Sequence, residues 1–314
     1  MTSIPLPPNA VALNRGSGSG PSRIPMQGRA AVLFGSLFAL PGVGIALLAL
    51  GVIGDVDRGR NAPRWAVLVC GVIFFTAGAM IIAAGLETLK IRRRAADQQR
   101  HFPRDPWRWD HSWSETGATD GSGGRIARAL GFALFLELFL TPFHWVGWFS
   151  PERPLPFRII PLVFDLVVVG LLWHAGVLVA RRRRFGSPVL RFARFPFLAG
   201  GSVEVTLPRF GQLGFVSRLT ATLRCIQERY ETRDSGDDRS REVVYYALWS
   251  ETLQVEPSRR GDFEMRFELP ADAPSSELST RPARFWELEL ASGDIPGADY
   301  SATFLIPVYA RGQA

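Results

Sequence analysis

The feature of this chain that most constrains its fold is a set of four long apolar stretches in its first 180 residues. They are residues 30–53, 66–86, 126–149 and 159–180, and they are almost free of charged side chains. Each has about 20 residues, and a helix of that length crosses a hydrocarbon layer about 30 Å thick. Buried helices of a soluble protein are the alternative, but they usually show shorter apolar runs and a polar stripe. We therefore predict four transmembrane helices.

The sequence around these stretches predicts three regions. Residues 1–28 are rich in Pro, Gly and Ser, and we expect a disordered tail. The apolar stretch after this tail is too long for a cleavable signal peptide and follows no short basic region. Residues 29–184 are expected to form the transmembrane domain, with a Trp-rich loop at 87–125, and residues 185–314 are expected to form a soluble domain.

The basic residues are concentrated in the membrane half. Residues 1–184 hold 21 Lys and Arg against 11 Asp and Glu, whereas residues 185–314 hold 15 against 18. Nine of the basic residues lie between Lys90 and Arg128, and four more lie at 181–184. Because short cytoplasmic loops are enriched in Lys and Arg, we predict that the N-terminus, the Trp-rich loop and the C-terminal domain are cytoplasmic. The mildly acidic C-terminal domain argues against binding of nucleic acid.

The C-terminal region has the alternating pattern of β-strands. Apolar side chains occupy every second position in six segments, 203–207, 217–225, 243–249, 262–269, 285–290 and 301–309. Such strands bury one face and expose the other. Segments rich in turn-forming residues separate them, at 233–240, 256–262, 270–276 and 292–299. The predicted fold class is therefore membrane α + β, with four helices followed by an antiparallel β-sandwich.

No catalytic constellation is apparent in the C-terminal region. It contains no His, the commonest general base, and its carboxylates mostly fall on outward strand positions or in turns. Cys225 shares the apolar phase of its segment with Leu219 and Leu223, so we expect a core residue instead of a nucleophile. Cys70 lies in the second apolar stretch, and no disulfide or zinc-type pairing is indicated. We expect neither enzymatic activity nor a cofactor.

Glycines recur every seven residues in the first two predicted helices. One row lies in the second helix and two lie in the first: Gly71, Gly78 and Gly85; Gly35 and Gly42; Gly44 and Gly51. Small residues let helix backbones approach closely in lipid, so we predict that these rows are packing seams. A pore lined by glycine is the alternative.

Four ionisable side chains lie within the third and fourth apolar stretches: Glu137, His144, Asp165 and His174. Such residues are the first place to look for transport chemistry. Their depths leave open a pair of His144 with Asp165 or a pair of Glu137 with His174, but not both with good geometry. A hydrogen bond that holds the helices together is the alternative use of these groups.

The Trp-rich loop contains the segment HFPRDPWRWDHSW at 101–113. A metal site there would use His101, His111 and either Asp105 or Asp110, at no standard zinc spacing. A nucleic-acid site would stack bases on the three Trp rings beside the two Arg side chains.

We favour a third interpretation of this segment, an aromatic anchor. Its residues are Trp107, Trp109, Trp113, Arg104 and Arg108. Trp is enriched at the headgroup level of membranes, and Arg is attracted to anionic lipid. The anchor would hold the loop against the membrane surface or against the C-terminal domain.

Two parts of the sequence resemble known proteins. The closing segment FWELELASGDIPGADYSATFLIPVY, preceded by FELPADAP, resembles the end of arrestin-like and immunoglobulin-like sandwiches. The segment DPWRWDHSW, two apolar helices, ARRRRFG and FPFLAGGSVEV together resemble a family of bacterial four-helix inner-membrane proteins of unknown function. That family has a Pro-Trp-x-Trp-Arg-x-Asp-Trp element between its second and third helices. This chain matches the element in its Pro and Trp residues, whereas Asp110 and Ser112 replace its Arg and Asp.

Together these features favour a non-enzymatic scaffold or adaptor that presents a cytoplasmic arrestin-like domain. The expected partners are the lipid bilayer and a protein that binds the C-terminal domain, and the sequence leaves open whether the chain forms a homo-oligomer. The alternative is a small transporter or proton-coupled membrane protein that uses Glu137, His144, Asp165 and His174.

Overall fold

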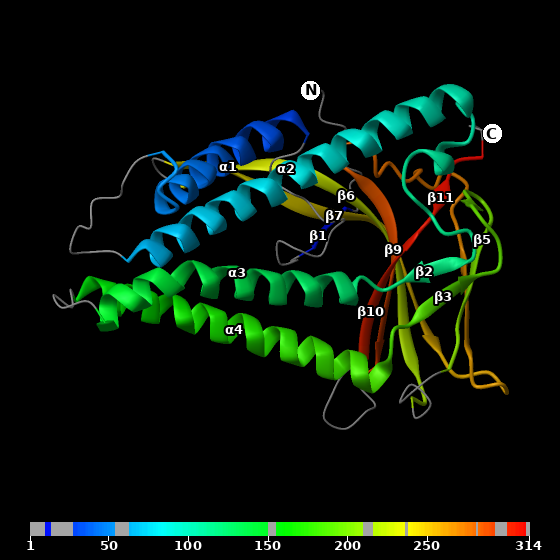
Figure 1. Cartoon of the computed structure of the whole chain (residues 1–314). Coiled ribbons are helices and arrows are strands. Elements are labelled where there is room, and N and C mark those ends of the chain that lie inside the picture. Colours follow the sequence, from blue (N-terminus) through cyan, green and yellow to red (C-terminus); the bar gives the residue numbers. More distant parts are fainter. Residues whose placement is uncertain are drawn as a thin grey trace. The chain divides into compact units, whose positions relative to one another are not determined.

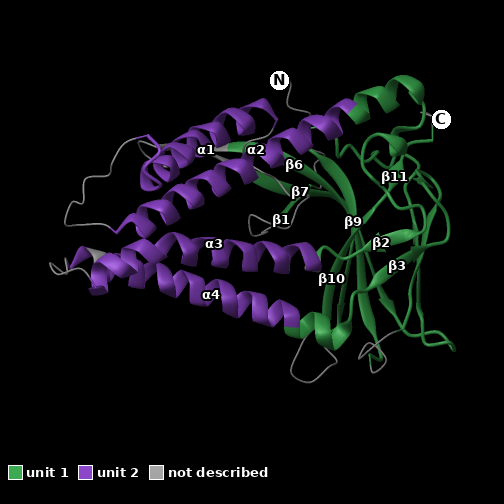
Figure 2. Ribbon diagram, in the orientation of Figure 1, with its two compact units in different colours: residues 1–23, 94–122, 180–314 green, residues 24–93, 123–179 purple. Residues whose placement is uncertain are grey.

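The computed structural model describes residues 10–13, 28–53, 63–149, 155–209, 216–235, 238–280, 282–292 and 300–311. The chain forms two compact units (Figure 2). Unit 1 comprises Met1–Arg23, Arg94–Ser122 and Ala180–Ala314, and unit 2 comprises Ile24–Arg93 and Gly123–Val179. The segment between the second and third helices therefore belongs to the same unit as the C-terminal strands.

Four long helices account for unit 2 and extend beyond it (Figure 1). They are α1 (Arg29–Ala49), α2 (Arg64–His101), α3 (Ser122–Phe149) and α4 (Pro156–Phe185). All four are long and apolar enough to cross a membrane. The four predicted helices are thus confirmed as helices.

The second helix continues well past its predicted end at residue 86. It runs to His101, so the first part of the predicted loop 87–125 is helical. Charges end the apolar run there, but the residues ETLKIRRRAADQQRH are mostly good helix formers and include no Gly or Pro. The helix ends just before Phe102 and Pro103, because Pro disfavours helical backbone at the preceding residue. In the same way α4 continues through its four Arg residues and ends before Gly186, whose φ is +73°.

The glycine seam between α1 and α2 is confirmed for five of the seven glycines. A Cβ atom at Gly42 would lie 2.3 Å from the backbone nitrogen of Phe75, and one at Gly78 would lie 2.4 Å from that of Ala39. A Cβ atom at Gly71, Gly35 or Gly85 would lie 2.6, 2.7 or 2.9 Å from the nearest backbone atom of the facing segment. The prediction is wrong for Gly44 and Gly51, which have nothing within 4 Å of an added Cβ atom. Because the facing backbone fills the space beside the five seam glycines, they line no pore.

The strands of unit 1 form three sheets. A five-stranded sheet has the order β1-β7-β6-β9-β10, a four-stranded sheet the order β2-β3-β5-β8, and β11 pairs with β4. The strands are β1 (Val11–Leu13), β2 (Gly117–Thr119), β3 (Val189–Phe192), β4 (Phe197–Leu198), β5 (Ser202–Leu207), β6 (Leu219–Ser235), β7 (Asp238–Val255), β8 (Phe263–Glu268), β9 (Arg284–Ser292), β10 (Tyr300–Ile306) and β11 (Val308–Tyr309). All pairs are antiparallel except β4 with β11, which is parallel.

One apolar core joins the two larger sheets. Side chains of β5 and β8, such as Val205 and Phe267, share it with Leu223 of β6 and Trp286 of β9. Cys225 belongs to this core with its side chain fully buried, which confirms its prediction as a core residue. The C-terminal part therefore consists of mostly antiparallel sheets, as the alternation predicted. We call the two larger sheets and the core between them the sandwich.

Strands β6 and β7 are much longer than the predicted segments 217–225 and 243–249. Most of the predicted turn at 233–240 lies within them, and they form one long antiparallel hairpin. The register shifts between Cys225 and Ile226, and both side chains are buried. The alternation along β6 continues through this point, because Cys225 faces the main core and Ile226 faces a second apolar cluster on the other side of the sheet. Glu228 lies on the same face as Ile226, and it is buried because this face is covered there. Its Oε2 accepts a 2.8 Å hydrogen bond from the Ala283 backbone nitrogen, which gives this carboxylate a structural role.

Four short strands lie outside the six predicted segments: β3 and β4 belong to the C-terminal region, and β1 and β2 come from outside it. Three residues of the predicted disordered tail, Val11–Leu13, form β1 and pair with β7, and most of the tail lies outside the described residues. In the Trp-rich loop, Gly117–Thr119 forms β2 and pairs with β3. The loop thus contributes an edge strand to the four-stranded sheet.

Candidate functional site

The segment 101–113 docks on the sandwich through Asp110. Asp110 is 7% exposed, and its carboxylate accepts hydrogen bonds from two consecutive backbone nitrogens, that of Leu278 at 3.0 Å and that of Ser279 at 2.8 Å. A short 3₁₀ helix, Pro106–Arg108, precedes Asp110, and the Asp110 backbone nitrogen donates to the Pro106 carbonyl at 2.9 Å. The turn that Pro106 starts therefore aims the carboxylate at the loop between β8 and β9.

Two Trp side chains surround this carboxylate contact. Trp113 donates its indole Nε1–H to the Tyr309 hydroxyl at 2.8 Å, and that hydroxyl donates to Asp110 Oδ2 at 3.2 Å. Trp107 meets the Tyr309 ring edge to face, with centroids 6.0 Å apart. Trp113 also packs against a second apolar cluster that contains Phe285. We call Trp107, Asp110 and Trp113 the docking residues.

The other residues of the predicted anchor have different roles. Trp109 is half-buried and donates its Nε1–H to the Phe102 carbonyl at 3.3 Å, within the segment itself. Arg108 is exposed, lies 4.5 Å from the Phe102 ring centroid and forms an ion pair with Asp105 at 3.4 Å. Arg104 is exposed. The structure thus brings two of the three Trp residues onto the sandwich and leaves both Arg residues outside.

Burial changes the titration of two groups in this contact. Burial lowers the pKa of His111 below its usual 6.5, and the nearby Asp110 carboxylate opposes that change. Burial, with the Asp110 charge as a second cause, raises the pKa of the Tyr309 hydroxyl well above its usual value of 10.0. Tyr309 therefore stays protonated and can donate to Asp110 over the whole physiological pH range.

These contacts bear on the interpretations of the segment. Both Asp110 oxygens accept backbone hydrogen bonds, so this carboxylate is already engaged as an acceptor. The Trp107 and Trp113 rings lie half-buried against the sandwich. The segment contacts the C-terminal domain, one of the two surfaces considered for an anchor.

Sequence reasoning named Asp110 only for a metal site and missed its docking role. Its hydrogen-bond partners lie 168 and 169 positions away, and no local pattern links the two segments. The available signal was a carboxylate that directly follows a Pro-Trp-Arg-Trp turn, since a charge within an apolar aromatic segment needs a partner when it is buried.

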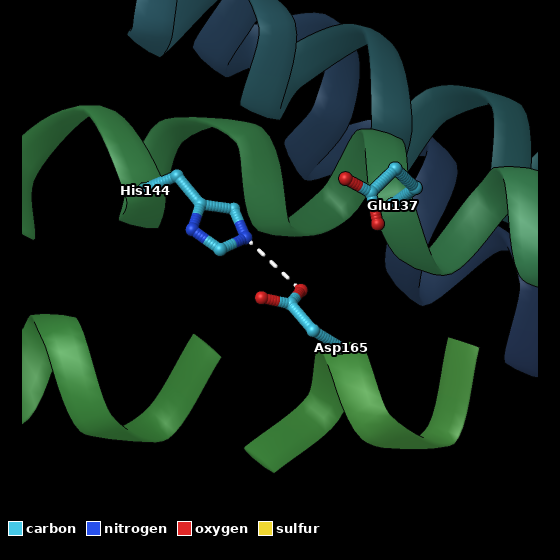
Figure 3. A group of neighbouring side chains, drawn as sticks. All are labelled: Glu137, His144 and Asp165. Carbon is cyan, nitrogen blue, oxygen red and sulfur yellow. Dashed lines mark hydrogen bonds and ion pairs between the residues drawn. The ribbon is translucent and has the colours of Figure 1, made fainter. Parts of the chain in front are cut away.

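The second candidate site lies within unit 2, between α3 and α4 (Figure 3). His144 Nε2 lies 3.1 Å from Asp165 Oδ1, and both side chains are about a quarter to a third exposed. Glu137 lies two helical turns before His144 on the same face of α3 and points toward the same pair. One ligand atom from each of Glu137, His144 and Asp165 lies within 4.8 Å of the others.

The structure forms one of the two cross-helix pairs that the sequence left open. His144 pairs with Asp165, and Glu137 joins that pair instead of meeting His174. His174 is exposed on α4, and it is not a member of this group. Asp165 and His174 are nine positions apart, a rotation of about 180° at about 3.6 residues per turn, so they face opposite sides of α4.

Comparisons with known proteins add little to this geometry. No protein-family model matches the chain, and no curated protein matches it either. Among solved structures, the sporulation control protein Spo0M from Bacillus subtilis matches 38% of this chain at 18% identity, with a TM-score of 0.25. The match covers 48% of the Spo0M chain, about half of its length. A likeness this weak carries no argument about the present chain.

Proposed function

We propose that this chain is a multi-pass membrane protein that works as a non-enzymatic scaffold or adaptor. The observation that carries the proposal is the docking of residues 102–119 on the sandwich, through Asp110, Trp107 and Trp113. The β-sandwich is thereby connected to the helices through α4 and also through both ends of the docked segment, which follows α2 and precedes α3. A domain with several such connections is suited to presenting a surface to a partner, and it needs no active site of its own.

In this proposal, the distribution of basic residues indicates the side of the membrane on which the sandwich lies. The basic residues between Lys90 and Arg128 and at 181–184 favour a cytoplasmic position for the sandwich, and a bacterial inner membrane fits this pattern. The proposed partner is a cytosolic protein. Membership of the family of four-helix inner-membrane proteins with an arrestin-like sandwich remains part of the proposal, and it rests on Pro106, Trp107, Trp109 and Trp113.

Topology is the first test. Single cysteines at Ser114, exposed in the docked segment, and at Val52, exposed after α1, would be labelled with a membrane-impermeant maleimide in a chain that lacks Cys70 and Cys225. We expect Val52→Cys to react in intact cells and Ser114→Cys to react only after the cytoplasmic face is opened. The reverse pattern would place the sandwich outside and contradict a cytosolic partner.

The scaffold role is tested by crosslinking in living cells. A photoreactive residue would replace Glu264, Arg266 or Glu268, which form the exposed face of β8, an edge strand. We expect the same discrete protein adduct from these positions, and a weaker adduct when Asp110→Ala is added. Leu37, 70% exposed on α1, is the control position, where we expect none of that adduct. Failure to form a protein adduct at all three β8 positions would contradict the proposal.

A proton-coupled membrane protein is the second candidate. The observation that favours it is the hydrogen bond of His144 with Asp165, with Glu137 beside it, inside two apolar helices. In proteoliposomes under a potassium diffusion potential, a pH-sensitive dye should report proton uptake that is lost in Glu137→Gln and His144→Gln. The same uptake should persist in His174→Gln. Equal uptake in all three variants and the wild type would exclude these residues from proton movement.

A further inference from the structure

Glu137, His144 and Asp165 form an unusual group for two apolar helices. They bring two carboxylates and one imidazole within 4.8 Å of one another, from neighbouring faces of α3 and α4 (Figure 3). The residues beside Glu137 are apolar and exposed, since Leu134 is 71% and Leu138 45% exposed. An acidic cluster on a soluble protein would be solvated, whereas this one lies among mostly apolar residues of two helices that are apolar enough to cross a membrane.

The charges of the three groups indicate what would stabilise them. If the helices span a membrane, as proposed above, two ionised carboxylates this close together in an apolar medium repel each other and lose their hydration. The hydrogen bond with His144 engages Asp165 alone. In the described part of the chain, the Glu137 carboxylate has no hydrogen bond or ion pair. A divalent cation bound to two carboxylates and a neutral imidazole would make the net charge of the group zero.

The spacing of the first two ligand atoms fits a shared cation. Two ligands at about 2.0–2.1 Å from one tetrahedral ion are separated by about 3.3 Å. His144 Nε2 and Asp165 Oδ1 are 3.1 Å apart and thus already near that spacing. Glu137 has to approach by a rotation of its flexible side chain, and Pro142 eases local adjustment because it donates no helical hydrogen bond in the turn between Glu137 and His144.

We propose that Glu137, His144 and Asp165 bind a divalent transition-metal ion between α3 and α4. The imidazole favours Zn²⁺ or Co²⁺ over Ca²⁺ and Mg²⁺, which prefer oxygen ligands alone. The metal takes the place of the hydrogen bond between His144 Nε2 and Asp165, and the neutral imidazole that binds it through Nε2 carries its proton on Nδ1. Three protein ligands leave at least one coordination position open, so the ion can exchange or bind a further ligand.

The test is metal binding by the purified full-length protein, without a polyhistidine tag, in lipid nanodiscs. Titration with Co²⁺, followed by its visible absorption and by calorimetry, should show one ion per chain. We expect Glu137→Gln and His144→Gln to weaken binding at least about tenfold, since each removes a ligand. His174→Gln removes an imidazole of the same helix pair outside the group, and its Kd should equal that of the wild type.

A second measurement guards against variants that fail to fold. X-ray absorption of the Zn²⁺-loaded wild type should show one imidazole nitrogen with oxygen ligands and no sulfur. Absence of stoichiometric binding by the wild type, or equal Kd values for His144→Gln and His174→Gln, would overturn the proposal. The scaffold function makes no prediction about Co²⁺ binding, so the two proposals can fail independently. If the protein binds Co²⁺ but takes up no protons in proteoliposomes, the metal site is supported and the proton-coupled alternative is contradicted.

Discussion

The hydroxyl of Tyr309, near the end of the chain, donates a 3.2 Å hydrogen bond to Asp110, although 199 positions separate the two residues. Tyr309 is fully buried in β11, and the same hydroxyl accepts a hydrogen bond from Trp113. This contact ties the segment between α2 and α3 to the last strand of the sandwich. The β unit is therefore completed by residues that precede α3 and α4 in the sequence.

Replacement of Asp110 by Ala should destabilise the sandwich. It leaves the buried backbone N–H group of Leu278 and the partly buried one of Ser279 without their carboxylate acceptor, and we expect a loss of about 2–4 kcal/mol in the free energy of unfolding. Cys225 can report this in the full-length chain. It is fully buried, and burial raises its pKa to about 12, so the thiol reacts only when the sandwich opens. The measurement is thiol labelling across a urea series in a Cys70→Ala background.

Asp105→Ala is the matched control for that experiment. Asp105 lies five positions earlier in the same segment, and its ion pair with Arg108 is partly exposed to solvent. We expect it to change the free energy of unfolding by less than about 1 kcal/mol. An equal effect of the two substitutions would show that the docking contact does not stabilise the sandwich.

Removal of the Tyr309 hydroxyl should have a smaller effect. Tyr309→Phe keeps the ring but leaves the Trp113 indole N–H without its acceptor, at a cost of about 1–2 kcal/mol. Tyr300→Phe provides a contrast within the same unit, because the buried Tyr300 hydroxyl has no hydrogen-bond partner in the described residues. We expect Tyr300→Phe to leave the free energy of unfolding unchanged or to raise it. If Tyr300→Phe lowered the free energy of unfolding more than Tyr309→Phe does, the stabilising role of the Tyr309 hydroxyl would be refuted.

Acid should weaken the docking contact through His111. Burial lowers the folded-state pKa of His111 below 6.5, so at lower pH the unfolded chain binds the proton more readily than the folded chain. The stability that the neutral, buried His111 allows is fully present above about pH 6.5, and it is lost as the pH falls through the folded-state pKa of His111. The urea midpoint of Cys225 labelling should therefore fall between pH 7.5 and pH 5.5, and less so in His111→Gln. His101→Gln, at the exposed end of α2, should keep the wild-type dependence.

The sequence predicted the elements of this fold better than their ends. Apolar run length predicted the four helices, and alternation predicted the main strands. The charged continuation of α2 to His101 was missed because charge ends an apolar run but does not end a helix. The burial of Glu228 was missed because alternation does not show when both faces of a strand are covered, and this face of β6 is covered by residues distant in sequence, such as Ala283.

The candidate sites show the same limit. The pairing of His144 with Asp165 was one of two pairs that helical geometry allowed, since depth along a helix can be counted from sequence. The choice between the pairs depends on how α3 and α4 are rotated, which sequence spacing does not determine. Asp110 was harder still, because its partners are backbone N–H groups at 278 and 279, and any residue type supplies those.

The glycine seam between α1 and α2 supports a last prediction, which compares Gly42→Ala with Gly44→Ala in the same helix. A methyl group at Gly42 would lie 2.3 Å from the Phe75 backbone, which cannot move without separating α1 from α2. We expect Gly42→Ala to destabilise the helix pair by about 1–3 kcal/mol. Gly44 lies two positions away and has open space around it, so Gly44→Ala should leave the helix pair intact and slightly favour helix formation.

The readout is the temperature at which the detergent-solubilised chain leaves its monodisperse peak in size-exclusion chromatography. A fall of a few degrees is expected for Gly42→Ala, and no fall for Gly44→Ala. Because both changes add the same methyl group to α1, helix propensity and apolarity change equally, and only the contact with α2 differs. Equal midpoints would therefore mean that α1 and α2 do not approach through Gly42, while a selective fall would support the close backbone contact along this seam.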